Sequence, residues 1–262
     1  MTLPPIDPVA FSLGSIHVRW YGIMYLLTFV IGYFLIGYFA KERKLKVNSD
    51  WVSDLLVTVL LGVILGGRLG YILFYNLAYY ISYPADIIKV WEGGMSFHGG
   101  MLGVILGLAI FAKIKKISFY KITDTIIPIV PIGIMLVRMG NFINGELYGR
   151  VTESKFCFNF ATDPANCRYP SQLIAAVLEG LCTFIILFTL RKRIKTPGIL
   201  SWIFILSYGA LRFIAEFFRE PDVQIGYYLN VFTQGQLFSI IMVVVAGVGM
   251  ILTKKITRSR TK

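Results

Sequence analysis

Long apolar runs alternate with short polar segments along the whole chain. The apolar runs cover residues 18–39, 51–75, 95–112, 122–140, 170–190, 199–218 and 234–253. A helix needs about 20 predominantly apolar residues to cross the hydrocarbon core of a bilayer. We therefore predict an all-α polytopic membrane protein with about seven transmembrane helices, in which residues 1–262 form a single integral membrane domain.

Positive charges are concentrated in alternate connections between these runs. The clusters follow the first, third, fifth and seventh runs and consist of Lys41, Arg43, Lys44 and Lys46; Lys113, Lys115, Lys116 and Lys121; Arg191, Lys192, Arg193 and Lys195; and Lys254, Lys255, Arg258, Arg260 and Lys262. Cytoplasmic loops of membrane proteins carry an excess of Lys and Arg. We therefore expect a cytoplasmic C-terminus, an N-terminus on the outer side and an odd number of spans.

Composition supports a membrane protein and limits its partners. The chain is 56% hydrophobic and 15% charged, whereas an ordinary globular domain is about 45–50% apolar and about 25% charged. The net charge of +12 would suggest nucleic acid for a soluble chain, but cytoplasmic loops facing anionic lipid account for it here. We predict no nucleic-acid partner, and residues 1–8, which lack basic side chains, predict no cleaved signal peptide.

Glycines recur every four residues in the second and third apolar runs. They are Gly62, Gly66 and Gly70 in the second run and Gly99, Gly103 and Gly107 in the third. Small residues at this spacing let helix backbones approach closely in lipid. We expect these two runs to pack against each other.

Several ionisable residues lie inside the apolar runs or at their ends. They are Arg68, His98, Arg138, Arg212 and Glu216. A charge near the bilayer centre costs about 2.5–3.5 kcal/mol on insertion scales, so such residues need a compensating role. In the predicted topology all of them fall toward the outer side. The pattern predicts a polar cavity that opens toward the outer leaflet and is lined by several helices.

The segment RMGNFINGELYGR at 138–150 opens an outer loop region at about 141–169. Its polar side chains, with glycines that permit close backbone approach, could bind a ligand or simply cap the helix bundle. Arg212 and Glu216 are four residues apart and share a helix face. They form either a self-compensating ion pair or a guanidinium oriented by a carboxylate to meet a phosphate.

Other polar residues fall outside this predicted cluster. We expect Glu179 and Asp124 each to find a partner on another helix. Cys157 and Cys167 share the outer loop, where a disulfide can form. No spacing of His, Cys, Asp and Glu resembles a metal site, so we predict neither a metal nor another cofactor.

At these residues the chain resembles the bacterial phosphatidylglycerol–prolipoprotein diacylglyceryl transferase family. The matching motifs are VRWYGIMY at 18–25, GGRLGY at 66–71, GGMSFHGG at 93–100, RMGNFINGELYGR at 138–150, PSQL at 170–173 and YGALRFIAEFFREPD at 208–222. The family commonly continues PSQL with Tyr-Glu and often has His before it. Here Ile174, Ala175 and Tyr169 stand at those positions, so any role of that His or Glu is not carried over.

The resemblance implies a reaction and two substrates. The diacylglyceryl group of phosphatidylglycerol moves to the thiol of the lipobox cysteine in a preprolipoprotein signal peptide, a thioether forms and glycerol phosphate leaves. This is the first step of lipoprotein maturation. It implies a multi-pass protein of the bacterial cytoplasmic (inner) membrane with an active site toward the extracytoplasmic side.

The chemistry requires a stabilised leaving phosphate and an ionised thiol. We expect Arg138 and Arg212 to bind the phosphate. The best candidate for the base is His98, because a histidine ordinarily titrates near neutral pH. The alternatives are Glu146 and the arginine-rich surroundings, which would lower the pKa of the thiol. The other positions expected to contact substrate are Tyr21, Arg68, Asn141, Gly149 and Glu216.

Two other functions fit part of the pattern. A lipid or small-anion transporter could bind an anionic headgroup without reacting with it, but no repeated halves are evident and transporter sites lie near the midplane. A receptor or scaffold would use the 138–150 segment for docking and would leave the arginines inside the spans unexplained.

Overall fold

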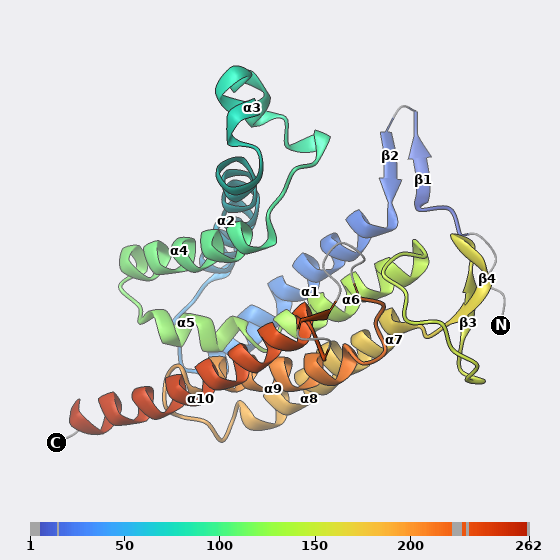
Figure 1. The fold of residues 1–262 in the computed structure, drawn as a ribbon. Helices are drawn as coiled ribbons and strands as arrows, with labels where there is room; N and C mark the ends of the chain where they lie inside the picture. The colour runs from blue at the N-terminus through green and yellow to red at the C-terminus, as the bar shows by residue number, and fades with distance from the viewer. Residues whose placement is uncertain (1–5, 15, 222–226, 229–230, 261–262) are drawn as a thin grey trace. The chain divides into compact units, whose positions relative to one another are not determined.

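The computed structural model describes residues 6–14, 16–221, 227–228 and 231–260 (Figure 1). Its contacts divide the chain into two compact units. The first comprises residues 1–31 and 126–262, and the second comprises residues 32–125. Asp222, Lys262 and residues 1–5, which entered the interpretation above, lie outside the described residues. A single integral membrane domain stays a prediction.

The second unit is built around two long helices, α2 (Ser49–Tyr75) and α4 (Phe97–Lys115). The short helices α3 (Leu77–Ser82), η1 (Pro84–Ile88) and η2 (Val90–Glu92) connect them. The chain enters this unit within α1 (Trp20–Glu42) and leaves it through α5 (Phe119–Ile126).

The predicted contact between the glycine stripes is confirmed. A Cβ atom placed on Gly66 would lie 2.8 Å from the Cα of Gly103, and one on Gly70 would lie 2.7 Å from the Cα of Gly99. Side chains at these positions would separate α2 from α4, so the glycines set the distance between the two helices.

Asp124 has the partner that we expected. It is fully buried in α5, and its Oδ2 lies 3.6 Å from Nη1 of Arg43, which belongs to the first basic cluster. Pairing offsets part of the cost of burying the carboxylate.

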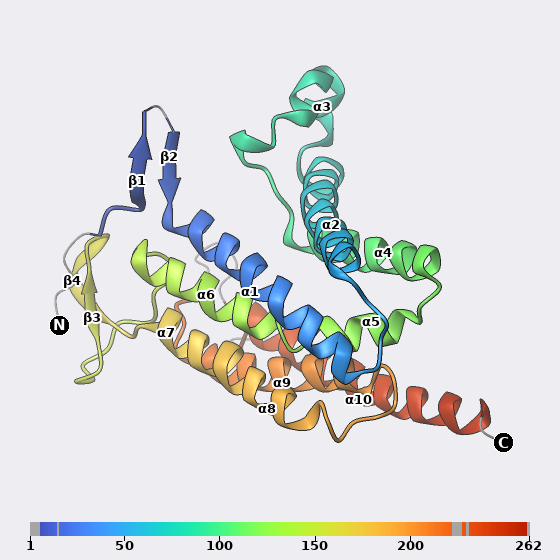
Figure 2. The same ribbon diagram turned by 180° about the vertical axis from the view of Figure 1, so that it is seen from behind.

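The first unit holds the remaining helices, which run side by side in both ribbon views (Figure 1 and Figure 2). They are α6 (Val130–Ile143), α7 (Ser171–Ala175), η3 (Ala176–Cys182), α8 (Thr183–Leu190), α9 (Ile199–Ala215) and α10 (Gln234–Arg260). The segment η3 is π-helical and lies between α7 and α8 without a break, so residues 171–190 form one continuous span.

Each predicted apolar run contains a helix, which confirms an all-α polytopic membrane protein. In the described part of the chain, five helices are individually long and apolar enough to cross a membrane, and α5 with α6, bent by 43°, would make a sixth. The apolar helix α9 has 17 residues and is shorter than these. The count of seven and the orientation of the termini stay predictions.

Helix ends differ from the predicted ones where basic residues follow an apolar run. Helix α10 continues to Arg260 rather than ending at 253, and α4 continues to Lys115 rather than 112. Lys and Arg are good helix formers, so hydrogen bonding continues after the apolar pattern stops.

The apolar pattern did not predict three short antiparallel hairpins. They pair β1 (Val9–Leu13) with β2 (Ile16–Arg19), β3 (Phe158–Phe160) with β4 (Asp163–Arg168), and β5 (Tyr227–Tyr228) with β6 (Phe232–Thr233). The hypothesised disulfide between Cys157 and Cys167 is confirmed, with 5.4 Å between the Cα atoms. It closes the β3–β4 hairpin, which belongs to the loop region that we placed at about 141–169.

Candidate active site

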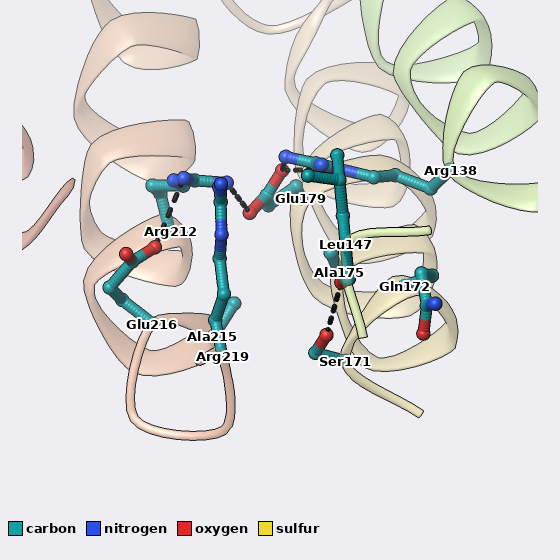
Figure 3. A pocket seen from close by; sticks show the side chains of 10 residues that line it. All are labelled: Arg138, Leu147, Ser171, Gln172, Ala175, Glu179, Arg212, Ala215, Glu216 and Arg219. Carbon is teal, nitrogen blue, oxygen red and sulfur yellow. Dashed lines mark hydrogen bonds and ion pairs between the residues drawn. The ribbon is translucent and has the colours of Figure 1, made fainter. Parts of the chain in front are cut away.

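Arginines from two helices meet on one buried carboxylate (Figure 3). Glu179 in η3 accepts hydrogen bonds at Oε2 from Nε and Nη2 of Arg138, at 3.3 and 3.0 Å, and at Oε1 from Nη1 of Arg212, at 2.9 Å. Arg138 comes from α6 and Arg212 from α9. Glu179 is fully buried, whereas each arginine side chain remains 16% exposed.

Our placement of Glu179 outside the polar cluster was wrong, because Glu179 stands at its centre. The sequence contained a signal for this. A carboxylate in the middle of an apolar run needs a cation on a neighbouring helix, and two arginines in other runs were available. The sequence does not show which runs are neighbours, so the spacing alone did not connect the three residues.

Glu216 adds a second carboxylate beside Arg212. Its Oε2 lies 3.0 Å from Nη2 of Arg212, so the two side chains form an ion pair on one helix face. A Cβ atom on Gly235 would lie 2.7 Å from both carboxylate oxygens, so this glycine leaves the space that Glu216 occupies. Gly235 is in the first turn of α10, where the helix dipole favours a negative charge.

A recess opens beside this cluster in the first unit. Its lining residues are Arg138, Leu147, Ser171, Gln172, Ala175, Glu179, Arg212, Ala215, Glu216 and Arg219. They come from α6, α7, η3 and α9 and from the segments that follow α6 and α9. The structure therefore brings Arg138, Arg212 and Glu216 to one polar recess between helices.

The PSQL segment holds the loop that forms one wall of the recess. Ser171 donates from Oγ to the carbonyl oxygen of Leu147 at 2.8 Å, and Gln172 donates from Nε2 to that of Glu146 at 2.7 Å. Leu147 has φ of 54°, which a residue with a bulky side chain rarely adopts. These two bonds support that conformation, and sequence reasoning missed both donors.

A second polar network lies one turn further along α6. Asn141, which is 1% exposed, donates from Nδ2 to Oε1 of Glu146 at 3.0 Å and also to the hydroxyl oxygen of Tyr21. Asn144 donates to the same Glu146 oxygen at 3.4 Å. Asn141 and Arg138 are three residues apart on one helix, so the network and the arginine cluster share a face of α6.

Gly149 stands where three backbone segments meet. Its N–H donates to the carbonyl oxygen of Tyr169 at 2.9 Å, and the N–H of Arg150 donates to that of Phe218 at 3.1 Å. A Cβ atom on residue 149 would lie 2.7 Å from the Tyr169 carbonyl oxygen. Close backbone approach accounts for this glycine, and its contact with substrate stays a prediction.

Arg68 and His98 belong to the second unit. The guanidinium of Arg68 donates to backbone carbonyl oxygens of Asp86 at 2.6 Å, Ile87 at 2.9 Å and Gly93 at 2.6 Å. This set of bonds favours a role in holding the α2–α4 connection. His98 is exposed in the first turn of α4, and its role as a base stays a prediction.

The arrangement suits an anion that carries apolar groups. Two guanidinium groups provide planar sets of donors, which match phosphate geometry. In the described part of the chain, Nη1 of Arg138 has no hydrogen-bond partner, so a bound anion can take this donor. Among the described residues no group of three or more His, Cys, Asp and Glu is arranged to hold a metal ion.

Comparison with known proteins identifies the family. The model of a family described as prolipoprotein diacylglyceryl transferase matches residues 8–252. A phosphatidylglycerol–prolipoprotein diacylglyceryl transferase of Geobacter sulfurreducens is 49% identical over 239 residues, which cover 91% of this chain and 92% of the relative. A protein of the same name from Pasteurella multocida is 44% identical over 256 residues, which cover 96% of this chain and 93% of the relative. Another from Rickettsia felis is 44% identical over 245 residues, which cover 92% of this chain and 95% of the relative.

Proposed function

Because the chain belongs to the prolipoprotein diacylglyceryl transferase family, we propose that it transfers the diacylglyceryl group of phosphatidylglycerol to the lipobox cysteine of preprolipoproteins. It is a multi-pass enzyme of the bacterial inner membrane that acts in lipoprotein maturation. The observation that carries the proposal is the convergence of Arg138 and Arg212 on Glu179 beside one recess.

The reaction moves negative charge onto the phosphate. The cysteine sulfur forms a bond to the terminal carbon of the diacylglyceryl group, and the bond between that carbon and the phosphate oxygen breaks. The electron pair of the broken bond stays on the oxygen, so a singly charged phosphodiester becomes glycerol phosphate. The thiol proton passes to a base.

Arg138 and Arg212 stabilise this developing charge. Guanidinium groups held in advance at the position of the leaving phosphate need no reorganisation during the reaction, and removing one such donor typically costs about 10²–10³ in rate. Their origin on separate helices, α6 and α9, lets the two groups approach a phosphate from different sides.

The network of Tyr21, Asn141 and Glu146 positions the headgroup. Its hydroxyl, amide and carboxylate groups lie together near the outer end of α6 in the predicted topology. They offer donors and acceptors for the hydroxyl groups of the phosphatidylglycerol headgroup, which a phosphate site alone would not recognise. Such polar matching discriminates strongly between headgroups.

The reaction also needs a group that accepts the thiol proton. His98 is the primary candidate, since imidazole is the usual proton acceptor near neutral pH. Glu146 is the alternative, because its carboxylate belongs to the network that shares a face of α6 with Arg138. Arg68 and Gly149 are the further positions that we propose to contact the substrate.

The test is a transfer assay with the full chain in lipid. Phosphatidylglycerol labelled in its headgroup is mixed with a lipobox peptide, and release of labelled glycerol phosphate is followed together with the mass of the peptide. We expect release only with the cysteine peptide and none with a peptide in which the cysteine is replaced by serine. Lipid movement across the bilayer without peptide, and without glycerol phosphate release, would instead support a transporter.

A further inference from the structure

Glu179 is the one carboxylate in the described recess that contacts both phosphate-binding arginines. Its burial and pairing fix it in place, because moving an ionised carboxylate away from its partners inside a protein is costly. Gly180, the next residue, packs against α6, and η3 is π-helical at this point. Segments of π-helix inside α-helices are frequent at functional sites.

The charges around the recess nearly cancel. The two arginines Arg138 and Arg212 are offset by the two carboxylates Glu179 and Glu216. Without Glu179 the remaining Arg138, Arg212 and Glu216 would carry a net charge of +1. In a partly buried site with a low effective dielectric, one charge changes anion affinity substantially.

Substrate and product differ in charge. The phosphodiester of phosphatidylglycerol carries one negative charge, whereas a phosphate monoester carries about −1.5 to −2 at pH 7 because its second pKa is near 6. A site with an uncompensated guanidinium group would therefore hold the product more tightly than the substrate and would turn over slowly.

We propose that the Glu179 carboxylate positions both arginines and sets the charge of the site so that it accepts a singly charged phosphodiester and releases the doubly charged phosphomonoester product. This inference rests on the proposed function. Glu179 acts through Arg138 and Arg212, so it is a positioning and specificity-determining residue rather than a catalytic one.

The first measurement uses the unmodified protein. Binding of glycerol phosphate and of glycerophosphoglycerol, the deacylated and singly charged form of the lipid headgroup, is measured by calorimetry on the full chain in lipid nanodiscs. We expect the two affinities to lie within about tenfold of each other at pH 7.5 despite the extra charge of the monoester. Much tighter binding of the monoester would overturn the proposal, whatever happens to any variant.

The second measurement uses Glu179→Gln, which removes the charge but keeps an acceptor for one arginine. We expect glycerol phosphate to bind at least about tenfold more tightly and to inhibit transfer correspondingly. This increase in affinity should largely disappear at about pH 5, where the monoester has lost its second negative charge. If Glu179 only supported the structure, its replacement would change the affinity for both ligands alike, whatever their charge. An equal change in affinity for the two ligands would therefore contradict the proposal.

Two variants serve as controls. Glu179→Asp keeps the charge but shortens the reach to the arginines, so we expect a raised KM with product inhibition close to that of the unmodified protein. Asp124→Asn removes a buried carboxylate that pairs with Arg43 in the second unit, and it should leave the discrimination between the two ligands unchanged. Stronger product inhibition in either control would overturn the charge argument.

Separate measurements of ligand binding and of diacylglyceryl transfer distinguish a failure of this inference from a failure of the proposed function. If the ligand discrimination depends on Glu179 as expected but no diacylglyceryl transfer occurs, the proposed function fails and the charge selection stands. If transfer occurs but Glu179→Gln leaves the discrimination unchanged, only the inference fails.

Discussion

Gly180 of η3 lies against Met135 of α6 so closely that a Cβ atom on residue 180 would fall 2.6 Å from the Met135 Cβ. Arg138 follows Met135 by three residues on the same helix, and Glu179 precedes Gly180. The contact therefore sets the distance across which Arg138 reaches Glu179.

Gly180→Ala tests this relationship. We expect the added methyl group to separate α6 from η3, to destabilise the protein by about 1–3 kcal/mol, and to lower the transfer rate by about tenfold or more because misplaced catalytic groups are costly. Thermal unfolding and the transfer assay measure the two effects. Gly247→Ala, at a position where a Cβ atom meets nothing within 4 Å, is the matched control and should change neither.

Arg138→Ala should abolish detectable transfer while the protein still inserts in the membrane. Loss of one preorganised donor typically costs about 10²–10³ in rate, and the partner carboxylate of Glu179 would remain buried with one arginine fewer. Peptide lipidation and membrane fractionation are the measurements. Turnover close to that of the unmodified protein would remove Arg138 from the phosphate site.

Arg212→Lys should also be poorly tolerated. Arg212 contacts Glu179 through Nη1 and Glu216 through Nη2, and the single ammonium group of lysine cannot reproduce two donors in a fixed plane. We expect a loss of about tenfold or more in kcat/KM, with the protein still folded. A lysine variant as active as the original would show that only the charge at this position matters.

Variants of His98 and Glu146 identify the proton acceptor. A free thiol has a pKa of about 8.5, so an enzyme that lacks its base should regain activity as the pH rises and the peptide thiol ionises without help. We expect this recovery for His98→Gln. If Glu146→Gln recovers in this way and His98→Gln does not, the base is Glu146.

The β3–β4 hairpin should lose stability in acid. A hydrogen bond from Arg168, with a further one from Asn166, holds the pKa of Asp163 below its usual value. A depressed pKa means that the stabilisation is complete above the ordinary carboxyl value near 4 and is lost as the pH falls through the lower folded value.

The comparison with Asp163→Asn isolates this carboxylate. The difference in melting temperature between the unmodified protein and the variant should be constant from about pH 7 to about pH 5 and should shrink below about pH 4. A difference that is unchanged in acid would mean that the ion pair contributes nothing to the hairpin.

The hydrophobic pattern predicted the helices well because the bilayer requires long apolar runs. It could not predict the hairpins, whose short strands depend on local pairing such as that between Val9 and Arg19. Nor could it identify Ser171 and Gln172 as supports of the loop, because their partners are backbone carbonyl oxygens that any sequence provides.

The site was predictable in part. Arg138, Arg212 and Glu216 stood out because charges in apolar runs are rare. Glu179 required knowledge of helix neighbours that the chain order does not contain. The reaction itself came from the resemblance carried by motifs such as that at 138–150, since the same charges would also suit a site that only binds an anion.

Hydrogen bonds connect the segment that follows α6 to two distant parts of the chain. Backbone bonds join Gly149 to Tyr169 and Arg150 to Phe218. The side chains of Arg168 and Ser171 donate two further hydrogen bonds to the segment. Moving this segment away from the recess would require all of these hydrogen bonds to break together. Several hydrogen bonds therefore hold this wall of the recess in place, and we expect entry of the lipid and release of the modified peptide to involve movement of other segments.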